Sequence, residues 1–299
     1  MRKLAIICFL SIGFLIGETA RASSIVDSWL YATILIENEW GEKGTGFLIA
    51  RDTGQDRFRV FLCTNKHVLN PKKELRDNAA KVILHLNVKE AGGKILGKPY
   101  EFALKSPDGK KRWKEHLQTD VDVLAFDVTD LVLTLPEMEK KWAKYSLFAD
   151  SKVLSEQNIT VGDEVMILGY PTGFKNIAYK QGDTNFPIVR QGIIATQIGQ
   201  IFIEEYIDKD GKKETKIFRG FLIDGGIIPG SSGSPVVLKP VMGRRVGKQI
   251  IMGESTPYLL GIVSQTKYAP VKTNDLSFAG LGLAFDSDTV KETIELFFK

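Results

Sequence analysis

The chain has 299 residues, of which 43% are hydrophobic and 25% are charged, and its formal net charge is +4. This length and apolar content allow a sizeable core, as one large β unit or as two smaller ones. The small positive surplus is spread along the chain, so neither nucleic acid nor an anionic membrane surface is an expected partner.

The first 22 residues have the three regions of a signal peptide. Arg2 and Lys3 precede an apolar run from Leu4 to Ile16, and small residues in an Ala-x-Ala pattern lead to Ala22. The apolar run is shorter than the roughly 20 residues that a membrane-spanning helix needs. We therefore expect cleavage after Ala22, export to the bacterial periplasm or the medium, and no stable membrane insertion afterwards.

The two cysteines do not form a disulfide framework. Cys8 leaves with the signal peptide, and Cys63 then has no intramolecular partner. An exported protein without disulfides fits a bacterial setting better than a eukaryotic extracellular one. Because Cys63 lies within an apolar run, we expect it to be a small buried residue and not half of a Cys–His pair.

Short runs rich in β-branched and aromatic residues alternate with glycine-rich and charged breaks along the mature chain, which is typical of an all-β sandwich or barrel. Only residues 287–298 have helical spacing, with Val290, Ile294 and Phe298 on one face and Ser287 or Asp288 as the cap. The predicted strands are 31–36, 46–50, 58–64, 81–88, 121–128, 164–169, 192–203, 216–223, 235–238, 258–264 and 278–285.

A polar interval near residues 149–160 divides the strands into two halves. We predict an N-terminal unit over 23–150 and a C-terminal unit over 151–299 that ends in the helix. The charged segment 71–117 is long for a loop, and we expect it to decorate the first unit.

One histidine is placed as a general base would be. The run 61–64 leads into His67 at its exit, where a side chain can be held at the rim of a barrel. His85 lies inside a predicted strand, and His116 lies in a charged segment where we expect it to be exposed to solvent.

An aspartate follows at the start of another apolar strand. Both Asp120 and Asp122 precede this strand, but the apolar run from Val123 to Phe126 follows Asp122 without interruption. A buried carboxylate can fix the tautomer of an imidazole and stabilise its protonated form. Asp122 is therefore the preferred partner for His67, while Asp120 is expected to cap the strand.

A glycine- and serine-rich segment, Gly230-Ser231-Ser232-Gly233-Ser234-Pro235, precedes a strand in the C-terminal half. Glycines let the chain fold tightly enough to expose a serine hydroxyl and to aim backbone N–H groups at a nascent oxyanion. Alone, the segment is equally typical of an ordinary turn. Its occurrence in one chain with His67 and Asp122 favours nucleophilic catalysis.

Several motifs in order resemble the trypsin-like serine proteases, and within them the protease domain of the high-temperature-requirement (HtrA) group. The chain order histidine, aspartate, serine is that of chymotrypsin-type enzymes. The motifs that carry the resemblance are Gly44-Thr45-Gly46-Phe47-Leu48-Ile49, Thr64-Asn65-Lys66-His67-Val68, Asp122-Val123-Leu124-Ala125-Phe126, Gly162-Asp163-Glu164-Val165, Gly169-Tyr170-Pro171-Thr172-Gly173, the run 223–235, Gly261-Ile262-Val263 and Gly280-Leu281-Gly282-Leu283-Ala284-Phe285.

The resemblance implies two packed six-stranded antiparallel β-barrels, over about residues 25–150 and 155–285, with a C-terminal helix and the active site between the barrels. It implies the catalytic triad His67, Asp122 and Ser232, and an oxyanion hole formed by the backbone N–H groups of Gly230 and Ser232. The expected activity is that of a serine endopeptidase that cleaves polypeptides, with no cofactor and no metal. The implied substrate pocket is formed by Gly226, Ile227, Ile228, Gly261, Ile262 and Val263, without an acidic residue, so a small or medium aliphatic side chain is the expected preference.

Three departures from the family pattern keep other interpretations open. Ser231 occupies the position of an aspartate that pairs with a new N-terminus in trypsin-type zymogens, Ser234 occupies a position usually held by glycine, and no PDZ domain is expected after the terminal helix. The alternatives are a trypsin-fold binding protein without turnover and an esterase that uses the same triad.

Overall fold

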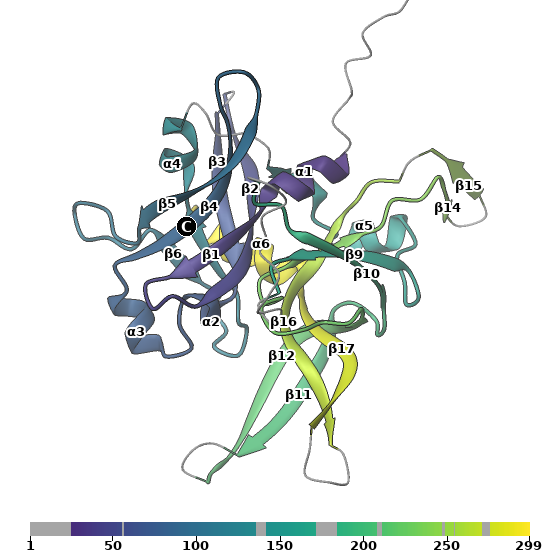
Figure 1. Cartoon of the computed structure of the whole chain (residues 1–299). Helices are drawn as coiled ribbons and strands as arrows, with labels where there is room; N and C mark the ends of the chain where they lie inside the picture. The colour runs from purple at the N-terminus through teal and green to yellow at the C-terminus, as the bar shows by residue number, and fades with distance from the viewer. Residues whose placement is uncertain are drawn as a thin grey trace, which may run out of the picture.

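The computed structural model describes residues 25–55, 57–135, 142–171, 184–207, 211–246, 249–253, 255–270 and 276–299. The predicted signal peptide lies outside the described residues, as do Thr172 and Gly173 of the predicted Gly-x-Pro-x-Gly loop. Nearly half of the described chain consists of strands, and all but one short hairpin of these strands belong to two large sheets. Figure 1 shows the blue strands of the first sheet beside the green and yellow strands of the second.

The first sheet contains the strands of the N-terminal half in the order β5-β4-β1-β2-β3-β7-β6. These strands are β1 (Thr33–Asn38), β2 (Lys43–Gly54), β3 (Arg57–Thr64), β4 (Lys81–Lys89), β5 (Ile95–Ala103), β6 (Trp113–Glu115) and β7 (Leu124–Asp127). A short strand, β8 (Ala143–Lys144), pairs in parallel with β2. The charged segment 71–117 is therefore more than a decoration, because its strands β4 and β5 extend the sheet through β1.

The second sheet contains the strands of the C-terminal half in the order β10-β9-β13-β16-β17-β12-β11, with an added β10–β12 pairing that closes it into a barrel. These strands are β9 (Glu164–Gly169), β10 (Ile188–Ile194), β11 (Gln200–Ile207), β12 (Lys213–Asp224), β13 (Pro235–Leu238), β16 (Leu259–Pro270) and β17 (Leu276–Asp286). A separate hairpin pairs β14 (Gly243–Val246) with β15 (Gln249–Met252). The predicted all-β fold of two packed units is confirmed, although the two sheets contain eight and seven strands where six each were expected.

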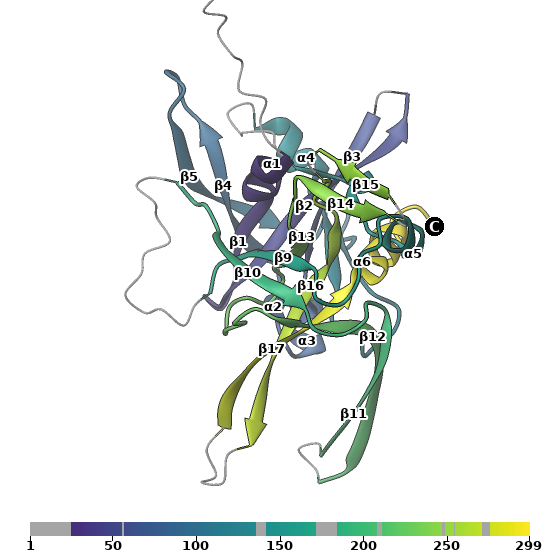
Figure 2. The same ribbon diagram turned by 90° about the vertical axis from the view of Figure 1, so that its right-hand side faces the viewer.

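Two long hairpins of the second sheet, β11–β12 and β16–β17, project beyond the rest of the molecule. Figure 2 shows them diverging from the point where β12 pairs with β17. This pairing ends at Gly220 on β12 and Phe285 on β17.

The predicted C-terminal helix is present as α6 (Ser287–Glu295). Its cap is Asp286, whose Oδ1 accepts a hydrogen bond from the Thr289 N–H at 3.0 Å, so neither predicted cap is correct. Other short helices were not predicted, because segments of eight residues or fewer show too little helical periodicity to be recognised. They are α1 (Ile25–Ala32), α2 (Lys66–Leu69), α3 (Lys73–Asn78), α4 (Thr129–Thr134), α5 (Ser151–Glu156) and the 3₁₀ turn η1 (Tyr145–Leu147).

The largest hydrophobic core cluster joins the two sheets. It contains Phe47 of the first sheet, Leu168 and Ile262 of the second, and Val290 and Ile294 of α6, all buried. Burial of apolar surface stabilises this junction by roughly 25 cal/mol for each Å² removed from water. The shared core therefore holds the loops at the junction in a defined arrangement.

Candidate active site

His67 and Asp122 meet at the edge of the first sheet. His67 lies in α2, directly after β3, and Asp122 lies just before β7, which pairs with β3. The Asp122 carboxylate contacts His67 twice, through Nδ1 at 2.5 Å and through the backbone N–H at 3.2 Å. The Asn65 side chain donates to the Asp122 carbonyl oxygen at 2.6 Å. The strand pairing thus brings together two residues that are 55 positions apart.

The contact with Asp122 selects the tautomer of His67. An ionised carboxylate can only accept hydrogen bonds, so Nδ1 carries the proton and Nε2 keeps a free lone pair. Burial lowers the pKa of His67, but the hydrogen bond and the negative charge of Asp122 outweigh it, so the pKa is raised above 6.5. The side chain of His67 remains 38% exposed. It is therefore a base whose accepting nitrogen a ligand can reach.

We expect an NMR titration to place the pKa of His67 above 6.5, and below 6.5 in an Asp122→Asn variant, where burial remains as the largest influence. Because the pKa of His67 is higher in the folded protein than in the unfolded protein, protonation of His67 stabilises the fold. This contribution is fully present below the pKa of the unfolded state and is lost as the pH rises through the raised pKa of the folded state. Equal pKa values in the two proteins would contradict the importance of Asp122.

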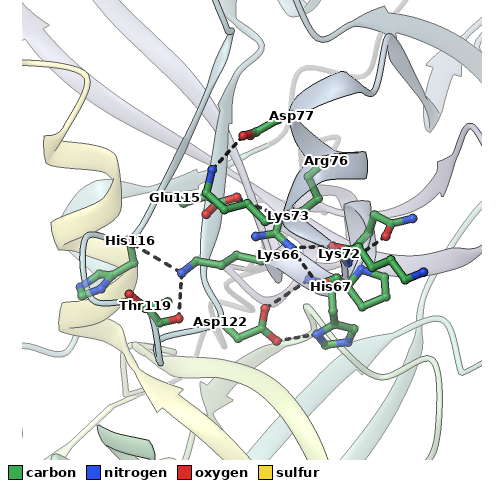
Figure 3. Close-up of polar contacts among 12 residues, drawn as sticks. Lys66, His67, Lys72, Lys73, Arg76, Asp77, Glu115, His116, Thr119 and Asp122 are labelled. Atoms are coloured by element: carbon green, nitrogen blue, oxygen red, sulfur yellow. Dashed lines mark hydrogen bonds and ion pairs between the residues drawn. The ribbon is translucent and has the colours of Figure 1, made fainter. Parts of the chain in front are cut away.

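A buried lysine holds the loop that carries Asp122. Lys66 is 6% exposed, and its ammonium group donates to the carbonyl oxygens of His116, Gln118 and Thr119 at 3.3–3.5 Å. Burial lowers the pKa of Lys66, while the charges of Glu115 and Asp122 raise it in part. Figure 3 shows the Lys66 side chain extending from beside His67 to this loop.

A second buried cation fixes the chain after α2. Arg76 of α3 is 6% exposed and forms an ion pair with Glu115 of β6 at 2.8 Å. Its guanidinium also donates to the carbonyl oxygens of Asn70 and Pro71 at 2.8 and 3.1 Å. The segment after His67 is thereby tied to the strand before Asp122, as Figure 3 shows.

Asp120 has a different role from Asp122. Its carboxylate accepts a hydrogen bond from the backbone N–H of Ile217 on β12 at 3.0 Å, and the Gln118 side chain donates to the Ile217 carbonyl oxygen. The loop before β7 therefore attaches to the second sheet through Asp120, and to His67 through Asp122.

Ser232, the predicted nucleophile, lies between β12 and β13 in residues 225–234, the nucleophile loop of that prediction. Its hydroxyl donates to the carbonyl oxygen of Ser264 on β16 at 3.2 Å, and no hydrogen bond within the described residues joins it to the ring of His67. The Ser264 hydroxyl donates to Asp122 at 3.2 Å. Ser264 thus links Ser232 to Asp122, which in turn contacts His67, and sequence reasoning missed it. The available signal was a hydroxyl residue directly after the apolar run 259–263.

The backbone of the nucleophile loop is held against the first sheet. Thr45 of β2 donates its N–H to the Ser232 carbonyl oxygen at 3.0 Å and its hydroxyl to the Gly230 carbonyl oxygen at 3.3 Å. At Gly233 the φ angle is +85°, and a Cβ atom would lie 1.8 Å from the Thr45 carbonyl oxygen, so only glycine fits. Across the described residues, no acceptor is bound to the N–H of Gly230 or of Ser232. Both donors are available to a ligand.

Two cavities meet at His67. One of about 550 Å³ is lined by Glu42, Lys43, Val68, Gly230 and Ser232 as well as His67. The other, of about 710 Å³, is lined by His67, Asp122, Ser264 and Gln265, among others. His67, Asp122 and Ser232 therefore lie along a cleft between the two sheets.

Three of the predicted pocket residues are covered by neighbouring strands. Gly261, Ile262 and Val263 belong to the part of β16 that is covered by neighbouring chain, and Ile262 and Val263 are at most 1% exposed. The next two residues of β16, Ser264 and Gln265, line the cavity beside His67.

The other three predicted pocket residues lie at the start of the nucleophile loop. Ile227 is 1% exposed and packs against Gly282, where an added Cβ would lie 2.3 Å from Ile227 Cγ1. Ile228 is partly buried, and Gly226 lines a shallow cavity next to β10. Ile227 therefore fills the space beneath Gly282.

Ser234, which departs from the family pattern, is fully buried, and its hydroxyl has no hydrogen-bond partner among the described residues. A Cβ atom at Gly169 would lie 2.0 Å from this hydroxyl. Ser234 therefore requires glycine at position 169.

We expect Gly169→Ala to lower the free energy of unfolding by about 1–3 kcal/mol through overpacking. In a Ser234→Gly background the nearest remaining contact outside Ser234 is Thr45 Oγ1 at 3.1 Å, so the cost should be much smaller. Urea unfolding of the four proteins of this double-mutant cycle measures the coupling. Additive effects would show that Ser234 is not the cause.

Two further expectations from the sequence have clear outcomes. His116 is not solvent-exposed, since its side chain is 9% exposed and pairs with Glu292 of α6 at 2.9 Å. Cys63 is fully buried, as predicted, and burial raises the pKa of its thiol. Neither residue is available for chemistry in the cleft.

The described residues contain no group of three or more histidine, cysteine, aspartate or glutamate side chains placed to hold a metal ion. Across the same part of the chain, no helix has the length and apolar character needed to cross a membrane.

A double β-sheet fold with a histidine–aspartate pair and a serine loop across the cleft defines the class of trypsin-like peptidases. Residues 44–247 match the family model of the trypsin-like peptidase domain. The chain therefore belongs to the trypsin-like peptidase family, as its motifs indicated.

Solved structures with a similar course of the chain have low sequence identity. The inactive form of the Rv3671c protease is 18% identical, with 92% of each chain covered and a TM-score of 0.46. The active form of Rv3671c from M. tuberculosis is 17% identical over 91% of this chain and 83% of that one, with a TM-score of 0.44. Deg5 is 16% identical, with 91% of each chain covered and a TM-score of 0.47. No curated protein matches the sequence.

Proposed function

We propose that the protein is a serine endopeptidase that cleaves polypeptides through an acyl-enzyme, with Ser232 as nucleophile, His67 as general base and Asp122 as its orienting carboxylate. The observation that carries this proposal is the 2.5 Å contact between Asp122 and His67 Nδ1, which leaves Nε2 free in a cleft that Ser232 also lines. We also propose that residues 1–22 direct export and are removed.

In the proposed reaction the Ser232 hydroxyl turns from the Ser264 carbonyl oxygen toward His67. Oγ bonds to the peptide carbonyl carbon while its proton passes to Nε2, and the oxyanion accepts hydrogen bonds from the N–H groups of Gly230 and Ser232. Collapse breaks the C–N bond, and the leaving amine takes the proton from His67. Water, deprotonated by His67, then attacks the ester and releases the acid and the serine.

The primary substrate pocket in this proposal is formed by Ser264, Gln265 and the start of the nucleophile loop. Ile227 is buried against Gly282, which reduces the depth available to a substrate side chain. The loop residues Gly226 to Ile228 carry no acidic group that would pair with lysine or arginine. These features favour a small or medium aliphatic side chain before the cleaved bond.

Labelling with a fluorophosphonate probe tests the proposal, because the probe reacts with an activated serine. Wild-type protein should be labelled at Ser232, and both Ser232→Ala and His67→Ala proteins should not. Absence of label on a folded wild type would overturn the proposal.

A binding protein without turnover is the second candidate, favoured by the Ser232 hydroxyl, which is bonded to Ser264 and not to His67. It predicts an unlabelled wild type that still retains peptides. An esterase predicts label and ester hydrolysis without peptide cleavage, so parallel peptide and ester substrates separate it from the endopeptidase.

A further inference from the structure

An arginine of the second sheet binds both ends of the segment that leads to Ser232. Arg190 lies on β10, and its Nη1 donates to the Gly226 carbonyl oxygen at 2.8 Å. Its Nη2 donates to the Ser231 hydroxyl at 2.7 Å. Because Gly226 begins this segment and Ser231 immediately precedes the nucleophile, one guanidinium spans the whole stretch.

The Ser231 hydroxyl is in an environment that requires such a partner. Ser231 is 0% exposed, so its hydroxyl has no access to bulk water. A buried polar group without a hydrogen bond is destabilising, and a charged donor gives a stronger bond than a neutral one. The planar fork of arginine directs two donors to fixed points, which an ammonium group does not do in the same geometry.

The rest of the nucleophile loop has other partners. Thr45 binds the carbonyl oxygens of Gly230 and Ser232, and the Gly233 N–H donates to the Val263 carbonyl oxygen at 2.9 Å. These contacts hold the carbonyl groups of Gly230 and Ser232 and the backbone of Gly233, the residue after Ser232. The turn between Gly226 and Ser231 depends on the internal Ser231 N–H to Ile228 bond at 3.1 Å, on Thr266, which binds the Ile227 carbonyl oxygen at 3.3 Å, and on Arg190.

This turn decides where two backbone N–H groups point. The turn leads into Gly230, whose φ is +87°, and a rotation of the peptide before Gly230 would redirect the Gly230 N–H. The two groups can bind one oxygen atom only while the turn keeps its shape.

We propose that Arg190 is a positioning residue that keeps the Gly230 and Ser232 N–H groups convergent, and so maintains the oxyanion hole. This inference rests on the proposed function. Arg190 does not line either cavity at His67 and acts through Gly226 and Ser231.

Arg190 can be reached from outside the cleft. Together with Asp224 and Gly226 it lines a shallow cavity of about 700 Å³ on the β10 side of the loop. A small cation added to the solution can therefore occupy the place of a deleted guanidinium group.

The test compares Arg190→Ala, Arg190→Lys and Ser231→Ala with wild type in the full chain, using an ester substrate and the fluorophosphonate probe. Loss of one oxyanion donor lowers kcat by about 10²–10³-fold, and we expect a fall of this size in Arg190→Ala with little change in KM. The pKa of His67 should stay at its wild-type value. Arg190→Lys should retain an intermediate kcat.

Guanidinium chloride at non-denaturing millimolar concentrations should partly restore kcat in Arg190→Ala and leave wild type unaffected. Arg244→Ala is the matched control, since Arg244 also binds two carbonyl oxygens and a carboxylate, at Gln157, Asn158 and Asp163, away from the cleft. It should keep wild-type kcat. An unchanged kcat in Arg190→Ala, an altered His67 pKa, or the absence of rescue would each overturn the inference.

Hydrogen–deuterium exchange keeps this test separate from the test of function. Arg190→Ala should exchange faster than wild type over residues 225–234, with no change over 116–123. If wild type is not labelled, the proposed function fails while exchange still decides whether Arg190 holds the loop. Equal exchange over 225–234 would overturn the inference even in an active enzyme.

Discussion

Replacement of Ser232 by alanine is expected to lower kcat for a peptide or ester substrate by about 10⁶-fold, the size of effect seen when a triad nucleophile is removed. Without Oγ no acyl-enzyme forms, and only substrate binding and the N–H groups of the loop remain to assist attack by water. The residual rate should be measured with a chromogenic ester and active-site-titrated wild type as reference.

His67→Ala should cause a loss of similar size, and the double variant should lose little more than either single variant. The two residues act in the same catalytic step, so once one of them is removed the other contributes little to kcat. Ser155→Ala, on the surface helix α5, should retain wild-type kcat. A double variant whose loss equals the product of both single losses would contradict a shared catalytic step.

Asp122→Asn is expected to lower kcat by about 10⁴-fold without disrupting the fold, because an amide at this position favours the wrong tautomer of His67. An asparagine at position 122 can donate a hydrogen bond to Nδ1, so the 2.5 Å contact seen with Asp122 no longer places the proton on Nδ1. Nε2 can then carry the proton and lack a free lone pair. Profiles of kcat/KM against pH should also change. In wild type the acid limb should lie above pH 6.5, since His67 must be neutral to act and its pKa is raised.

Asp120→Asn is the matched control for this substitution. An asparagine oxygen can still accept the hydrogen bond from the Ile217 N–H, so the loop should keep its attachment to β12. We expect kcat to change by less than about tenfold, the equivalent of 1.36 kcal/mol. Equal losses in the Asp120 and Asp122 variants would show that the whole loop, and not the carboxylate at His67, determines the rate.

Much of the fold could be predicted because many strands are short runs rich in apolar residues, and because the apolar residues of α6 recur at helical spacing. β1, β3 and β9 show such runs clearly. β5 does not, since Gly97 and Pro99 interrupt it and most of its residues are only partly buried. Its place in the sheet follows from pairing with β4, which is a long-range property.

The short helices were missed for a related reason. α2 has four residues and exists because Asp122 and the carbonyl oxygens near it hold Asn65, Lys66 and His67. No local pattern in the sequence encodes these partners, which arrive from a loop about 50 residues later.

The choice of Asp122 over Asp120 came from counting where an apolar run begins, and the structure places Asp122 alone of the two at His67. The predicted pocket residues Gly261 to Val263 came from a match of motifs, which does not show which residues of a strand face the cleft. In β16 those residues are covered by β13 and β17, and the strand reaches the cavity only at Ser264.

The sequence by itself determined the class of fold and the family, and it predicted the three side chains of a catalytic triad, because each is written in a short local motif. Only the tertiary structure decided how these side chains are supported: Ser264 beside Asp122, Lys66 beneath its loop, and Arg190 behind Ser231. These contacts join residues 41 to 142 positions apart, and hydrogen bonds act over about 3 Å. Their partners are therefore set by the packing of the two sheets, which no local motif records.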